Sequence, residues 1–427
     1  MKEAFLHYVW ANQLFNSSQL YTASNEELII HSPGTFTGLD GPDFFNARLQ
    51  IGAQQWAGNV EIHINASDWY AHHHEIDRRY DSIILHVVWD NDTPVFRADG
   101  KEVTVFIMKN YVDADVLSRC NQLFLRKPHF NCEDTISSIP AHIWINWKEK
   151  LFLERLEEKI TPIQDLLKIT NNHWEHVFFC FLAKSFGLNA NGEAFFDAVK
   201  NLPILSIYKQ SHSLLQIEAL LFGVTGLLAT EDEIEDNYVK ELKREWTFLK
   251  HKYNIEEQSV SSLRFFQLRP PNFPTIRLAQ LSSWLYHQQM PVTSILTTSD
   301  LDYFYSLFDV QISEYWQTHY VFNKVSKKQN KRISRDFIDL VIINVILPMQ
   351  IAYKQSNSID EYDVSDVIDL AVKIKPEKNS IINLFEQYKV GADSALDSQA
   401  LVHLKKKYCD KGRCLECQLG KQYLKQK

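Results

Sequence analysis

Residues 44–64 read FFNARLQIGAQQWAGNVEIHI, and this stretch decides the fold of the first part of the chain. Two runs with the composition of strands, Phe44–Ile51 and Gln55–Ile64, are joined by Gly52-Ala53-Gln54. A short, glycine-containing link between two such runs is typical of a β-hairpin. The sequence therefore predicts two antiparallel neighbours in a sheet.

The second strand of this hairpin carries two ionisable residues. Side chains alternate between the two faces of a strand, so Glu61 and His63 share one face. The other face carries the apolar side chains of Val60, Ile62 and Ile64. This pattern predicts one face in a core and the other in a cleft.

Further elements are expected on both sides of the hairpin. A polar helix is expected from Ser67 or Asp68 to Tyr80, because both residues are good N-caps. The nearly continuous apolar run Ser82–Trp89 indicates a buried central strand. The other expected elements are a helix within residues 3–23 and strands at Glu27–His31 and Val103–Met108.

The pattern changes from about Ile139 onward, where amphipathic helical segments dominate. We predict an α+β protein: an N-terminal α/β domain with a mixed sheet (1–130), a mainly α-helical domain (131–405) and a cysteine-rich tail (406–427). The tail is expected to pack back on the N-terminal domain.

Composition indicates a globular protein. Of 427 residues, 45% are hydrophobic and 23% are charged. The apolar run near Leu340–Leu347 is too short to span a bilayer, and the first residues do not resemble a signal peptide. We expect a cytoplasmic protein with no membrane partner. The net charge of −8 leaves any nucleic-acid contact to local patches, of which the clearest is the lysine- and arginine-rich stretch 324–335.

Asp43 and Glu61 are the first candidates for chemistry. Asp43 starts the first strand of the hairpin and can lie beside Glu61 on the second. Two converging carboxylates form a hard oxygen site that suits Mg²⁺ or Mn²⁺. A surface polar pair of Glu61 and His63 is the structural alternative.

The polar helix and the strand after it supply supporting candidates. His73 and His74 lie four and three residues before Asp77, so in a helix Asp77 could orient one imidazole. Tyr80 follows one turn later. His86 lies in the buried strand, where it is a candidate site residue or a core histidine. The histidines of the helix could also be solvated.

The order Pro42-Asp43, hairpin, Glu61-Ile62-His63 resembles the PD-(D/E)-x-K nuclease superfamily. That resemblance implies a restriction-endonuclease-like mixed sheet, metal-binding acids at Asp43 and Glu61, and nucleic acid as substrate. His63 stands where the superfamily has lysine, and a histidine could accept a proton from water or stabilise phosphate.

The whole chain also resembles a bacterial family classed as a domain of unknown function. The residues that carry this resemblance include the Gly58–Val88 block, the Arg269–Pro274 segment and the cysteine-rich tail. The resemblance implies no activity.

The tail contains Cys409, Cys414 and Cys417 in the pattern Cys-x4-Cys-x2-Cys. This spacing lets thiolates share one ion, with Cys132, Cys120 or His129 as a fourth ligand. Zinc, an iron–sulfur cluster, free thiols and a disulfide are the alternatives. Some nucleases of the superfamily carry an iron–sulfur cluster, which a partnership with Cys132 would resemble.

Three functions follow, of which the least favoured is a metal-dependent hydrolase of another ester or small molecule. The first is a Mg- or Mn-dependent nuclease with Asp43 and Glu61 as ligands and His63 as the base or phosphate stabiliser. The second is a non-catalytic scaffold with a nuclease-like fold that binds nucleic acid or protein.

Overall fold

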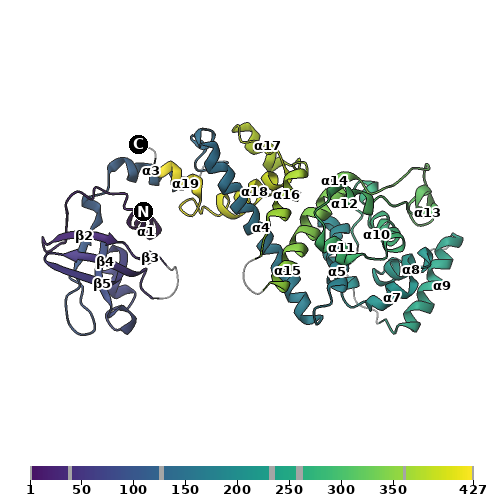
Figure 1. Cartoon of the computed structure of the whole chain (residues 1–427), viewed down its shortest axis with the longest axis horizontal. Helices are drawn as coiled ribbons and strands as arrows, with labels where there is room; N and C mark the ends of the chain where they lie inside the picture. The colour runs from purple at the N-terminus through teal and green to yellow at the C-terminus, as the bar shows by residue number, and fades with distance from the viewer. Residues whose placement is uncertain are drawn as a thin grey trace. The chain divides into compact units, whose positions relative to one another are not determined.

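The computed structural model describes residues 2–36, 41–124, 129–229, 236–255, 263–358 and 362–425. The chain forms two compact units. The first unit contains Met1–Trp147, Leu384–Val390 and Leu404–Lys427, and the second contains Lys148–Asn383 and Gly391–His403. Sheet and helices are coloured along the chain in Figure 1.

The first unit is built on a mixed sheet of seven strands in the order β1-β2-β4-β5-β6-β7, with β3 also pairing with β4. β5–β6 and β6–β7 are parallel pairs, and the other pairs are antiparallel. The strands are β1 Leu20–Tyr21, β2 Glu27–Ser32, β3 Thr35–Phe36, β4 Phe44–Ile51, β5 Gln54–Asn65, β6 Ile83–Asp90 and β7 Val105–Ile107.

Helices form the rest of the first unit. They are α1 Glu3–Ala11, α2 Asp68–Ala71, η1 Arg78–Tyr80, η2 Met108–Asn110, α3 Ala114–Phe124, η3 Ile136–Ser138, the start of α4 Ala141–Ile169, the end of α17 Ser380–Gln387, η6 Leu404–Cys409 and α19 Gln418–Lys425. The short η elements are 3-10 helices except η6, which is a π-helix.

The second unit is almost wholly helical. Its elements are the remainder of α4 and of α17, α5 Trp174–Phe186, α6 Leu188–Val199, α7 Ile204–Gln210, α8 Leu214–Val224, α9 Asn237–Lys252, η4 Pro270–Asn272, α10 Pro274–Gln288, α11 Val292–Thr297, α12 Leu301–Leu307, α13 Glu314–Thr318, the small hairpin β8 His319–Val321 and β9 Lys324–Val325, α14 Arg335–Val341, the π-helix η5 Ile342–Ile346, α15 Leu347–Asn357, α16 Ser365–Lys373 and α18 Ala395–His403. The predicted α+β class, with a mixed sheet followed by helices, is confirmed.

The predicted hairpin is β4–β5, and the predicted central strand is β6. Gly58 allows these strands to approach closely, because a Cβ atom at this position would lie 2.5 Å from Ile84 Cγ2 and 2.8 Å from the Ser82 carbonyl oxygen. One face of the sheet, with Ile62, Val87 and Phe106 side by side, is covered by α1. Trp10 of α1 has its ring centroid 6.2 Å from that of Phe106.

The link from β5 to β6 crosses the other face, since parallel strands require a long connection. This link, residues 66–82, contains α2 and η1. It packs Trp69 and Tyr80 into a core cluster with Val88 and Val105. The same face carries Glu61 and His63 from β5, so the crossover is placed over the candidate site.

The predicted helix begins at Asp68 as expected, but its predicted extent to Tyr80 is wrong. α2 ends at Ala71, and His73 has a φ of 61° in the left-handed region, which a regular helix does not contain. The first predicted helix is also shorter than expected, because α1 ends at Ala11 and β1 follows at Leu20.

Residues Arg335–Asn357 form one continuous helical stretch, longer than the apolar run seen in the sequence. With a mean hydropathy of 1.6 over 18 residues it is apolar and long enough to cross a membrane, but 72% of that window is buried inside the protein. This burial is that of a core helix.

Candidate functional site

The candidate site is a polar pocket of about 400 Å³ in the first unit. Side chains from α1, the start of β4, β5 and the crossover reach it. Its lining residues are Glu3, Gly41, Asp43, Glu61, His63, His72, His74, Asp77, Arg79 and Tyr80.

Three imidazoles gather in this pocket. One nitrogen from each of His63, His72 and His74 lies within 4.8 Å of the others, which is close enough for all three to bind one ion. His63 Nε2 is 3.1 Å from His72 Nδ1. Imidazole nitrogens are ligands that zinc, iron, copper and nickel prefer.

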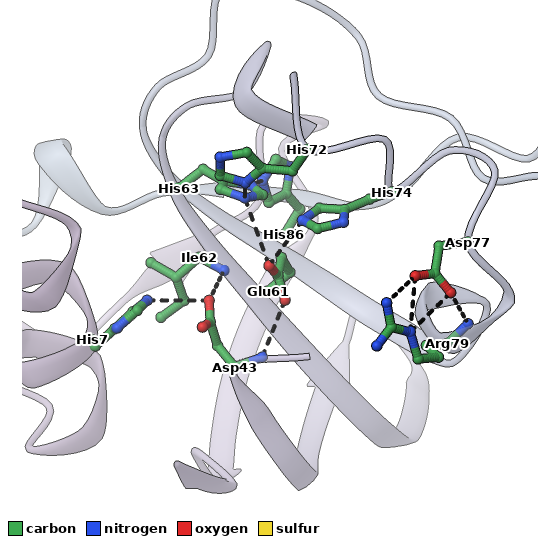
Figure 2. A network of polar contacts seen from close by, with 10 residues as sticks. All are labelled: His7, Asp43, Glu61, Ile62, His63, His72, His74, Asp77, Arg79 and His86. Atoms are coloured by element: carbon green, nitrogen blue, oxygen red, sulfur yellow. Dashed lines mark hydrogen bonds and ion pairs between the residues drawn. The ribbon is translucent and has the colours of Figure 1, made fainter. Parts of the chain in front are cut away.

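Glu61 adds a carboxylate to this group. Its Oε1 lies 3.3 Å from His74 Nε2 and 3.6 Å from His63 Nε2. Figure 2 shows the three histidine rings above Glu61. Three imidazoles and a carboxylate form a ligand set for a transition metal such as Zn²⁺.

His86 fixes the ring of His63 from behind. His86 is fully buried, and its Nε2 lies 2.8 Å from His63 Nδ1. The register of the parallel strands creates this contact, because Glu61 of β5 pairs with His86 of β6. A hydrogen bond at one ring nitrogen orients the other, and this is the usual arrangement around a metal-binding histidine.

Asp43 lies beside Glu61, as the hairpin predicts. The Asp43 backbone N–H donates to Glu61 Oε2 at 3.1 Å, and Asp43 Oδ2 accepts from the Ile62 backbone N–H at 3.0 Å. The same oxygen is 3.1 Å from His7 Nε2. These contacts fix the carboxylate of Asp43 at the wall of the pocket (Figure 2).

Burial keeps the site largely neutral. It lowers the pKa of His63 to about 2 and that of His86 to about 3, with neighbouring imidazoles adding to the effect, and it also lowers the pKa of His74. Burial and the charge of Asp43 raise the pKa of Glu61 well above its usual range. Neutral imidazoles have free lone pairs, so the group is prepared to bind a cation.

His7 behaves differently from the other histidines. Burial alone would lower its pKa, but the hydrogen bond to Asp43 and the charge of Asp43 outweigh it, and the pKa of His7 is raised. His7 and Glu3 were not among the residues predicted from the sequence. A signal was present, because Glu3 and His7 are four residues apart in a helix whose other positions include Phe5, Leu6 and Val9.

Asp77 does not orient an imidazole as predicted. Because the crossover is not a continuous helix, Asp77 instead accepts hydrogen bonds from the Arg79 side chain, at 2.8 and 2.6 Å, and from its backbone N–H. Figure 2 shows this pair to one side of the histidines. Asp77 still lines the pocket.

Tyr80 forms part of the wall. Its ring stacks on His74 with centroids 3.7 Å apart, and burial raises the pKa of its hydroxyl to about 12. His73 is exposed, and its left-handed backbone lets His72 and His74 on either side both line the pocket. His72 therefore lines the pocket, although the spacing to Asp77 singled out only His73 and His74.

The lysine-rich stretch 324–335 is not a uniform surface patch. Lys331 is buried, and its Nζ donates to the carbonyl oxygens of Trp316 and His319 at 2.6 Å. Lys331 thus ties the β8 hairpin to the following segment instead of facing a ligand.

Comparison with curated proteins and with solved structures returns no match. A family model does match residues 3–380, a range that contains the whole histidine pocket and ends before the cysteine-rich tail. This range is most of the chain, so the protein belongs to the family described as "Protein of unknown function (DUF2851)".

Proposed function

We propose that the pocket is the active site of a metal-dependent phosphodiesterase that acts on nucleic acid. The observation that carries the proposal is the convergence of His63, His72 and His74 beside Glu61 in an open pocket. The choice of substrate rests on the resemblance to nucleases in the order of Asp43, the hairpin and the Glu61-x-His63 strand.

The ligand set bears on the metal. Mg²⁺ or Mn²⁺ is the prediction for Asp43 and Glu61 alone, but three imidazoles favour a softer ion. We therefore propose Zn²⁺, held by His63, His72 and His74 with Glu61 beside them. Mn²⁺, a harder ion, is the alternative that the carboxylates of Glu61 and Asp43 would favour. Such an ion polarises a phosphoryl oxygen and lowers the pKa of bound water.

The other residues position the reactants. Asp43, fixed by His7 and the Ile62 N–H, can accept a proton from water at the pocket wall. Arg79 has a side chain 58% exposed at the pocket, where its guanidinium can donate to a phosphate. His86 holds the ring of His63 in place. We propose the cytoplasm as the compartment.

The experiment is cleavage of a mixed panel of single- and double-stranded DNA and RNA with Mn²⁺, Zn²⁺ or Mg²⁺. We expect Mn²⁺- or Zn²⁺-dependent cleavage that falls at least about 100-fold in His74→Ala and Glu61→Gln. His73→Ala is the matched control, because this residue is adjacent in sequence but exposed.

A wild-type protein that cleaves nothing on the panel with any of these metals would overturn the proposal. Nucleic-acid binding that Glu61→Gln leaves unchanged, without cleavage, would instead support the non-catalytic scaffold. In such a scaffold, Asp43 and Glu61 would serve only to hold the strands together, through the hydrogen bonds that their carboxylates accept from main-chain N–H groups.

A further inference from the structure

Four cysteines of the first unit line a second, much smaller pocket. They are Cys132, between α3 and η3, Cys409 at the end of η6, and Cys414 and Cys417 just before α19. Cys132 and Cys417 are buried, and Cys409 and Cys414 are half-buried. None of the four is in a disulfide. Cys132 is more than 270 positions away in the sequence from the other three cysteines that line this pocket.

The four cysteines come from two segments that are far apart in the sequence. Cys132 lies between α3 and η3, and the other three lie within residues 409–417. Cysteine binds a metal as the thiolate, so four cysteines around one pocket offer a complete set of ligands for a divalent cation.

The surroundings contain hydrogen-bond donors aimed at sulfur. Asn131 Nδ2 donates to Cys414 Sγ at 3.5 Å, and the backbone N–H groups of Leu419 and Gly420 donate to Cys417. The Cys417 sulfur therefore lies at the N-terminal end of α19, where N–H groups favour a negative charge. Such donors stabilise metal-bound thiolates.

Gly420 shows how closely the tail folds on itself. A Cβ atom at this position would lie 2.0 Å from the Cys414 carbonyl oxygen, a distance that no side chain can occupy. The turn from Cys414 to Cys417 is thereby pressed against α19. A two-residue spacing between cysteines is typical of metal-binding loops.

The cavity between the cysteines is small. Its volume is about 20 Å³, close to what one water molecule requires, so a single ion fits it. A complete set of four protein ligands is typical of a structural zinc site.

We propose that Cys132, Cys409, Cys414 and Cys417 bind one structural Zn²⁺ that fastens residues 404–427 to the segment containing Cys132. The thiols give up their protons to solvent as the zinc–sulfur bonds form, and no oxidation or reduction takes place. The site is separate from the proposed active site in its residues and in its chemistry.

The test is metal analysis of the full chain purified without oxygen. To separate the two sites, zinc is measured in a His74→Ala background, where only the cysteines should hold it. We expect one zinc per chain, falling to none in Cys414→Ser/Cys417→Ser. Cys120→Ala is the control, because Cys120 is a buried thiol of the same unit that does not line the pocket.

A second measurement on the His74→Ala protein, whose cysteines are all intact, guards against a serine variant that fails to fold. Growth with Co²⁺ in place of zinc should give the intense near-ultraviolet absorption of thiolate–cobalt bonds. Zinc content unaffected by the double substitution, a cobalt protein without thiolate absorption, or iron with acid-labile sulfide in place of zinc would each overturn the proposal.

Discussion

The histidine pocket and the cysteine pocket differ in ligand type and in openness. The first has imidazole and carboxylate ligands around about 400 Å³ of space, and the second has four thiols around about 20 Å³. Catalytic metal sites keep a position open for water and substrate, whereas structural sites fill all positions with protein ligands. By this criterion the open histidine pocket suits a catalytic ion and the small cysteine pocket suits a structural one, if both proposed sites bind metal.

Removal of metal should separate the two pockets most strongly. Brief dialysis against EDTA should abolish nuclease activity while leaving the cysteine-bound zinc in place, because the open site exchanges ligands with solvent and the closed one does not. The measurement is activity and zinc content over time, followed by readdition of Mn²⁺. If both metals leave at the same rate, the distinction between open and closed sites fails.

A substitution at Gly420 should damage only the closed site. In Gly420→Ala the new methyl group collides with the Cys414 carbonyl, so we expect a loss of about 3 kcal/mol in unfolding free energy, as for other severe steric changes. Urea unfolding measures it. Gly391→Ala is the control, because a Cβ atom there meets nothing within 4 Å. Equal stability of the two variants would contradict the proposed packing.

Loss of His86, which contacts His63, should weaken metal binding less than loss of one of the proposed ligands. We expect His86→Phe to weaken Mn²⁺ or Zn²⁺ binding at the histidine pocket about 10- to 100-fold, because the Nδ1 of His63 loses the group that orients it. Calorimetric titration checks this, and the cysteine-bound zinc serves as the internal control. Unchanged affinity would show that packing alone holds the ring of His63.

The smallest effect concerns a buried acid with no imidazole contact. Glu218 in α8 accepts from Tyr238 Oη at 2.8 Å and Ser313 Oγ at 2.9 Å, and burial raises its pKa to about 7. The folded protein holds this proton more tightly than the unfolded one, so its contribution to stability is present below about pH 4.5 and is lost as the pH rises to about 7.

Glu218→Gln should remove this dependence, and its stability relative to wild type should rise by about 1 kcal/mol or more over that range. Urea unfolding at several pH values, with and without Mn²⁺, measures the difference. We expect no effect of Mn²⁺ on it, since Glu218 has no histidine partners among its hydrogen bonds. If Mn²⁺ changed this stability difference, Glu218 would be linked to the metal site, contrary to the expectation that only Glu61 is.

The sheet was the most predictable part of the molecule. The hairpin follows from two strand-like runs around Gly52, and β6 follows from its apolar run, because both signals are local. Glu61, His63 and Asp43 come together as their strand positions predict. The strand alternation that placed them needs no knowledge of distant residues.

The crossover could not be predicted in the same way. Residues 67–80 have good N-caps and helical spacing, but packing of Trp69 and Tyr80 on the sheet favours a broken path with His73 in the left-handed region. Tertiary contacts outweighed local propensity here. The contact of His7 with Asp43 was missed because it joins a helix to the residue just before β4, 36 positions away.

The first unit is built from segments that are far apart in the sequence, and this has a consequence for biosynthesis. Residues 1–147 leave the ribosome long before residues 404–427 that complete the same unit. At about 5–20 residues per second, roughly 250 intervening residues take roughly 10–50 s to translate. During that interval Cys132 is a nascent-chain thiol without its three partners. The unit can close only after residues 404–427 have emerged.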